Sequence, residues 1–188
     1  MKRSQINKAV RNATRFFEDN GWTLPPNPQW DVTDFGLGDF EKLGLVLVNL
    51  TEEPEYCEKL MYAHKGQTTP AHTHKKKKED IICRAGTLAI QVWNGASGSS
   101  EVLSITLKVN GKATNFESAD IIRLQSGERL TLTPGVYHEF YPESDECIIG
   151  EVSTANDDLH DNFFVNTEVG RFSQVEEDEA PLVKLVSD

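Results

Sequence analysis

Apolar residues recur at three- and four-residue spacings near the start of the chain. They are Ile6, Ala9, Val10, Ala13, Phe16 and Phe17. This spacing places them on one face of a helix, which Ser4 can cap at its start and Gly21 can end after about Asn20. We therefore expect residues 1–23 to form an N-terminal helix with one apolar face.

The pattern changes between residues 24 and 42. The stretch LPPNPQWDVTDFGLGDF, residues 24–40, contains three prolines and two glycines, which disfavour a continuous helix. It predicts an extended arm between the helix and the rest of the fold.

From residue 43 onward the chain consists of short β-rich stretches separated by turn residues. Examples are LGLVLVNL, DIICRAGTLAIQVW and IIRLQSGERLTLTPG. Asn110-Gly111 is a strong signal for a two-residue hairpin. Many short strands of this kind indicate an antiparallel sandwich or jelly-roll barrel, here over residues 43–172. The acidic tail, residues 173–188, is expected at the periphery of this single, all-β-dominated domain.

Composition narrows the classes of function. A chain of 188 residues can bury a substantial core as one domain. Its net charge of −11 argues against binding to nucleic acid or anionic membranes, and no apolar run is long enough to span a bilayer. The three cysteines form no CxxC pair and suit buried thiols in a reducing cytoplasm.

The segment TPAHTHKKKKED, residues 69–80, raises the question of a metal site. His72 and His74 are two residues apart, so on a strand they share a face. Glu79 follows closely, and TPGVYHEF supplies His138 later in the chain. Imidazoles and a carboxylate can bind a divalent transition metal. A bare His-x-His pair occurs more often in a polar loop, so the pair alone does not decide the question.

The spacing around these residues resembles the first motif of the cupin family. The matching positions are Gly66, His72, His74, Glu79 and Gly86. A second motif is partial: Gly135 stands three residues before His138, but Thr133 and Pro142 replace the usual proline and asparagine. The resemblance implies a cupin jelly-roll barrel in which His72, His74, Glu79 and His138 bind a metal.

Longer blocks are similar to the D-lyxose isomerase family within the cupins. They include DFGLGDFEKLGLVLV (34–48), YCEKLMY (56–62), KEDIICRAG (78–86) and IGEVSTANDDLHDNFFVNTEVGRF (149–172). The resemblance implies a cytoplasmic, homodimeric, manganese-dependent enzyme that interconverts aldoses such as D-lyxose and D-mannose with their 2-ketoses. For the metal, imidazole ligands also suit Fe²⁺, Co²⁺, Ni²⁺ or Zn²⁺.

Such a reaction moves either a hydride or, through a cis-enediol, a proton between C2 and C1 of the sugar, and the proton route needs a base. In CIIGEV, alternation places Glu151 on one face with Cys147 and Ile149. Alternation alone is equally compatible with the strand's exit into solvent, and the family resemblance favours catalysis. Lys59, alternating with Cys57, either projects into the barrel to bind a substrate oxygen or is a surface charge.

Further polar residues have weaker assignments. By resemblance to the family, Asp161 and Arg171 are expected to bind distal hydroxyls of the sugar or to assist proton movement between O1 and O2. Without that resemblance, the two residues would be read as an ordinary surface ion pair. Most of the lysine run, residues 75–78, is typical of a solvated turn. One member, Lys76 or Lys78, can bend over the mouth of the barrel toward a ligand. His64 and His160 are expected to be structural or solvated.

Several functions share this ligand set, because cupin barrels support many reactions. The leading hypothesis is an isomerase of unphosphorylated D-lyxose or D-mannose. A sugar-phosphate isomerase, an iron-dependent dioxygenase and a non-catalytic sugar-binding cupin are the alternatives.

Overall fold

The computed structural model describes residues 1–95, 104–154, 157, 160–170 and 174–188. The predicted helix is present as α1, Arg3–Asp19, and Gly21, with a positive φ of 77°, follows its end. The prediction that Ser4 caps this helix is wrong. Ser4 lies inside the first turn, where its backbone N–H and hydroxyl donate hydrogen bonds to Asp178 (2.9 and 2.7 Å). A carboxylate from the tail thus binds the N-terminal turn.

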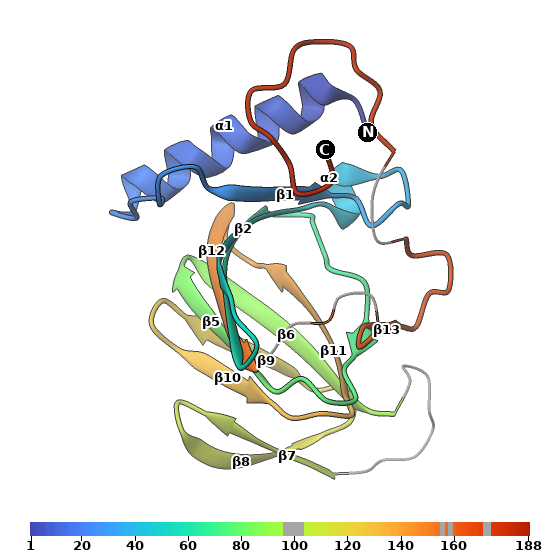
Figure 1. The fold of residues 1–188 in the computed structure, drawn as a ribbon. Coiled ribbons are helices and arrows are strands. Elements are labelled where there is room, and N and C mark those ends of the chain that lie inside the picture. The colour runs from blue at the N-terminus through green and yellow to red at the C-terminus, as the bar shows by residue number, and fades with distance from the viewer. Residues whose placement is uncertain (96–103, 155–156, 158–159, 171–173) are drawn as a thin grey trace.

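About half of the remaining described residues lie in strands, which form two antiparallel sheets (Figure 1). The larger sheet has the order β1-β2-β3-β12-β5-β10-β7-β8. Its strands are β1 (Gln29–Thr33), β2 (Leu45–Glu52), β3 (Tyr56–His64), β5 (Glu79–Ala85), β7 (Ser104–Val109), β8 (Lys112–Glu117), β10 (Arg129–Leu132) and β12 (Glu146–Thr154). As predicted, Asn110 and Gly111 connect β7 to β8, both with positive φ, as a type I′ hairpin requires.

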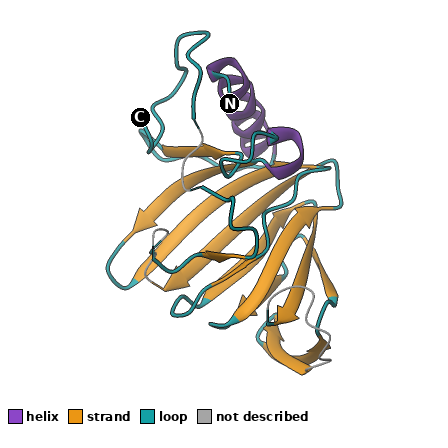
Figure 2. Ribbon diagram, turned by 90° about the vertical axis from the view of Figure 1, so that its right-hand side faces the viewer, coloured by secondary structure: helices purple, strands orange, loops and turns teal. Residues whose placement is uncertain are grey.

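The smaller sheet has the order β13-β4-β11-β6-β9. Its strands are β4 (His72–Thr73), β6 (Thr87–Asn94), β9 (Ile121–Gln125), β11 (Val136–Pro142) and β13 (Phe163–Phe164). The two sheets face each other (Figure 2), and alternate residues of both point into a shared apolar core. Leu88, Ile90, Leu124, Leu130 and Ile149 are fully buried there. The predicted all-β jelly-roll fold with an N-terminal helix is confirmed.

Helix α1 packs on the outer face of the larger sheet and forms a second apolar core. Ile6, Ala13 and Phe17 are fully buried. The Phe17 ring lies 6.5 Å, centroid to centroid, from the rings of both Trp30 on β1 and Tyr62 on β3. The predicted apolar face of the helix is therefore the face that contacts the sheet.

Residues 24–42 are not a separate arm, because part of this segment belongs to the sheet. They contain strand β1, which pairs along its whole length with β2, and most of the short helix α2, Phe40–Leu43. The sheet thus begins at Gln29 rather than near residue 43. β1 is only five residues long between Pro28 and Gly36, so the surrounding turn residues hide its alternation.

The described part of the tail, residues 174–188, lies beside α1 and β1, and both ends of the chain are at this side of the molecule (Figure 1). Isolated bridges join Lys2 to Glu176 and Trp30 to Leu185. The guanidinium of Arg3, 3% exposed, forms ion pairs with Glu177 (2.6 Å) and Asp188 (2.8 Å). The tail is a strap over the helix. Within the described residues, no helix is long and apolar enough to cross a membrane.

Candidate metal centre and catalytic site

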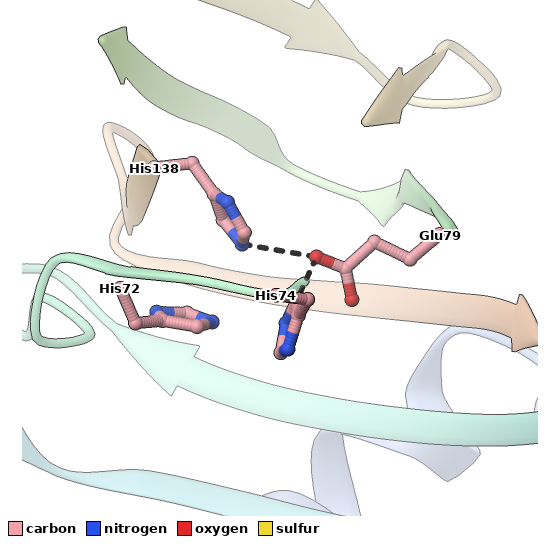
Figure 3. Close-up of side chains that lie close together, drawn as sticks. All are labelled: His72, His74, Glu79 and His138. Carbon is pink, nitrogen blue, oxygen red and sulfur yellow. Dashed lines mark ion pairs between the residues drawn. The ribbon is translucent and has the colours of Figure 1, made fainter. Parts of the chain in front are cut away.

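Three histidines and one glutamate meet between the two sheets, as the sequence predicts (Figure 3). His72 on β4 lies directly opposite His138 on β11, and His74 follows β4. Glu79 opens β5 of the other sheet. One potential ligand atom from each of the four residues lies within 4.8 Å of the others.

Hydrogen bonds orient the three imidazoles. The Nδ1 atoms of His72, His74 and His138 lie 2.9, 2.7 and 3.2 Å from the carbonyl oxygens of Pro70, Asp161 and Val136, respectively. A carbonyl oxygen only accepts, so each Nδ1 must carry the hydrogen. In the neutral ring, Nε2 then keeps a lone pair, which is the form that binds a metal.

The atoms that face one another have no hydrogen-bond partner. Nε2 of His74, Nε2 of His138 and Oε1 of Glu79 are all buried and unsatisfied, although the two nitrogens lie 3.5 and 2.9 Å from that oxygen. Two lone pairs directed at a carboxylate oxygen repel it unless a cation lies between them. The donor set therefore fits a divalent metal ion.

The protonation states support this fit. Burial, together with the neighbouring His138 and His74, holds the pKa of His72 well below its usual range. Burial would raise the pKa of Glu79, but the Lys77 ammonium holds it well below its usual value. Neutral imidazole and ionised carboxylate are the forms required of metal ligands.

One lysine of the run does enter the site, but it is Lys77 rather than Lys76 or Lys78, which are exposed. Its Nζ lies 2.9 Å from Oε2 of Glu79 and 2.9 Å from Oε1 of Glu151. Burial would lower the pKa of Lys77, but these two carboxylates hold it above its usual value. Lys77 thus links the metal cluster to the predicted catalytic base.

Glu151 and Lys59 both point into the barrel. They are directly opposite each other on β12 and β3, each is 6% exposed, and Lys59 Nζ lies 3.8 Å from Glu151 Oε1. The alternative interpretations, in which Glu151 marks the strand's exit into solvent and Lys59 is a surface charge, are therefore wrong. Two cations beside one buried carboxylate compensate its charge where water cannot.

The remaining predicted residues lie elsewhere. Asp161 is buried, and its carboxylate accepts hydrogen bonds from backbone N–H groups of residues 75–77. Arg171 lies outside the described residues. His160 is exposed and bonded to Asp157, and His64 lies 3.5 Å from Glu41 at the barrel's edge, both consistent with the expected structural or solvated roles. The cysteines are free and buried, as expected.

A cavity of about 260 Å³ opens beside the four candidate ligands. Lys59 on β3, Glu151 on β12 and Lys77, which precedes β5, line it. Apolar side chains, among them Phe35 and Phe164 with ring centroids 6.1 Å apart, line it as well. Its size is close to the lower end of the range for ligand pockets, roughly 300 Å³, and suits a small molecule.

Sequence reasoning missed several residues of this cavity, and three of them are polar or charged side chains close to the proposed chemistry. Asp31 and Thr33 line it from β1, the strand hidden in the proline-rich segment. The inward direction of Lys77 could have been predicted from the sequence. Residues 77, 79 and 81 are two apart, so in an extended segment Lys77 points to the same side as Glu79 and Ile81. This two-residue spacing was overlooked because four consecutive lysines are typical of a solvated turn.

Comparisons with known proteins agree with this geometry. The sequence model of a family described as D-lyxose isomerase matches residues 27–188. A D-lyxose/D-mannose isomerase of Escherichia coli O157:H7 is 33% identical over 223 residues, an alignment that covers 100% of this chain and 98% of the relative. One from Serratia proteamaculans is 34% identical, with 96% and 94% covered.

Solved structures agree at the level of the fold. An L-ribose isomerase of Cellulomonas parahominis, determined with L-ribose, has a TM-score of 0.71 and 17% identity. The similarity covers 94% of this chain and 98% of that one.

Proposed function

The chain belongs to the D-lyxose isomerase family, and from that membership we propose that it interconverts D-lyxose with D-xylulose and D-mannose with D-fructose. It is a sugar isomerase, and membership favours aldose–ketose interconversion over the dioxygenase and the binding-protein hypotheses. The observation that carries the proposal is Glu151, a buried carboxylate in the same cavity as the three histidines and Glu79.

We assign the metal to His72, His74, Glu79 and His138. A divalent ion held there would polarise the sugar carbonyl and stabilise negative charge on the adjacent oxygens. Manganese is the proposed ion, by resemblance to the family. A homodimeric state and a cytoplasmic location likewise remain proposals.

Glu151 is the proposed base. Its carboxylate takes the proton from C2 of the bound aldose, which leaves an enediolate, exchanges it with solvent, and then delivers a proton to C1 as the hydroxyl proton of O2 passes to O1. Lys77 and Lys59 present ammonium donors to the same part of the cavity. They can hydrogen-bond the sugar oxygen that becomes negative.

The test is proton NMR of Mn²⁺-loaded protein with D-lyxose or D-mannose in D₂O. Ketose with solvent deuterium at C1 is expected, because a carboxylate base exchanges its proton with solvent. Ketose without deuterium would retain the isomerase and point to a hydride shift or a shielded proton. Absence of ketose from both sugars would overturn the proposal, and mannose 6-phosphate in parallel would detect a preference for phosphorylated substrates.

Glu151→Gln tests the base directly. The amide cannot accept the C2 proton, so turnover should be abolished while the bound metal remains at the wild-type stoichiometry. Substantial remaining turnover would remove Glu151 from the mechanism.

A further inference from the structure

Asp161 lies between β12 and β13 and is 5% exposed. It is not among the described residues that line the cavity. Its Oδ1 accepts hydrogen bonds from the N–H groups of Lys75 (2.9 Å) and Lys76 (3.1 Å). Its Oδ2 accepts from those of Lys76 (3.1 Å) and Lys77 (2.8 Å). Three consecutive backbone donors thus converge on one carboxylate, an arrangement that favours an anion.

The main chain of Asp161 makes a second contact with the same turn. Its carbonyl oxygen lies 2.7 Å from Nδ1 of His74, which fixes the hydrogen on Nδ1 and directs Nε2 toward Glu79. Asp161 therefore contacts every residue from His74 to Lys77. This turn begins with a proposed metal ligand, His74, and ends with the lysine that forms ion pairs in the site, Lys77.

From these contacts we infer that Asp161 is a positioning residue for the catalytic site rather than a group that binds the sugar. It holds the turn of residues 74–77 so that the imidazole of His74 and the ammonium of Lys77 both face the cavity. The inference rests on the proposed metal site and isomerase activity.

Charge and neighbouring contacts support this role. Lys75–Lys78 carry four consecutive positive charges, which repel one another and favour an open turn. The Asp161 carboxylate lies against the backbone of this turn and opposes that repulsion. Two further contacts join the segment that follows Asp161 to the turn that contains the lysines. Lys75 Nζ lies 4.1 Å from the centre of the Phe163 ring, and Phe163 pairs with Thr73.

Asp161→Asn is the perturbation of choice, since it preserves size and removes the charge and one acceptor. The amide introduced there can keep its oxygen toward one pair of N–H groups, but its NH₂ group must then face another donor. Removal of a partner that orients a metal ligand typically costs roughly 10- to 100-fold in metal affinity or activity. We expect Mn²⁺ affinity and kcat each to fall by about that factor, with little change in KM for D-lyxose.

Mn²⁺ affinity is measured by calorimetric titration of the metal-stripped protein, with kcat and KM measured on the saturated protein. Asp157→Asn is the matched control, because it removes the same charge from an exposed position in the same segment, and it should match the wild type. Asp161→Glu, which keeps the charge, should recover part of the affinity and serves as the test if the Asp161→Asn variant does not fold.

Two results would overturn the inference. A raised KM with unchanged Mn²⁺ affinity would mean that Asp161 binds the sugar. A lowered Tm with unchanged Mn²⁺ affinity and kcat would mean that it only stabilises the fold. Because the Mn²⁺ titration needs no turnover, it tests the positioning role even if the protein does not act on D-lyxose or D-mannose.

Discussion

Lys77→Met removes the cation placed between the metal cluster and the proposed base. The ammonium contacts Glu79 and Glu151 at 2.9 Å each, and all three side chains are almost completely buried. Methionine retains much of the length and the apolar stem of lysine but carries no charge. In the variant, the carboxylates of Glu79 and Glu151 would face each other with no ammonium group between them.

The magnitude follows from the geometry. At an effective dielectric constant of about 20, unit charges 2.9 Å apart attract by roughly 6 kcal/mol. Much of this attraction offsets the cost of removing the ions from water, and loss of one partner of a buried pair typically costs about 3–5 kcal/mol. We expect the free energy of unfolding of the metal-free protein to fall by that amount. Saturating Mn²⁺ should restore part of it, because a metal ion would compensate the charge of Glu79.

Urea denaturation of the metal-free and Mn²⁺-saturated protein measures this loss, and kcat for D-lyxose should fall about 10²–10³-fold because a donor to the developing oxyanion is lost. Lys76→Met is the matched control, since it removes the same charge from an exposed position of the same turn and should change stability by no more than about 0.5 kcal/mol. If both variants matched the wild type in stability and kcat, Lys77 would have no electrostatic role.

Three further predictions concern the cavity, the helix and the tail. Asp31→Asn, in the part of the cavity formed by β1, should raise KM for D-lyxose and D-mannose unequally while Mn²⁺ affinity stays constant; equal KM values in variant and wild type would exclude substrate contact. Phe17→Ala should lower the free energy of unfolding by about 3–5 kcal/mol in urea denaturation, and a loss below about 1 kcal/mol would contradict the observed packing. The Arg3 guanidinium lowers the pKa of Glu177 and Asp188, so their stabilising contribution is complete above the usual carboxylate pKa of about 4 and is lost as the pH falls through their lowered values. The NMR signal of the Arg3 Nε–H should shift in that range, and a signal that stays constant through acid titration would argue against these ion pairs.

The sequence predicted the parts of the site that depend on local spacing. His72, His74 and Glu79 lie within one short segment, and His138 follows the recognisable turn at Gly135, so the cluster could be proposed from motifs. To assign Glu151 and Lys59 to the site, one must also know which face of each strand points into the barrel. Alternation alone left this open, and the pairing of β12 with β3 shows it.

Contacts between distant segments were not predictable. The carboxylates of Asp161 and Asp178 bind backbone N–H groups far away in sequence, and a backbone donor carries no sequence signal of its own. Strand β1 was missed for a different reason. Its residues are stabilised by pairing with β2 and by packing against α1, whereas the local prolines and glycines indicate a loop.

The strap formed by the tail has a consequence for the order of folding during synthesis. Arg3 and Glu177 are 174 residues apart, which at about 5–20 residues per second corresponds to roughly 9–35 seconds of translation. Until the strap emerges from the ribosome, Arg3 lacks both of its carboxylate partners and the outer core lacks Leu185. Completion of the outer core is therefore expected only after the strap has left the ribosome, whereas the β7–β8 hairpin, whose contacts are local, can form earlier.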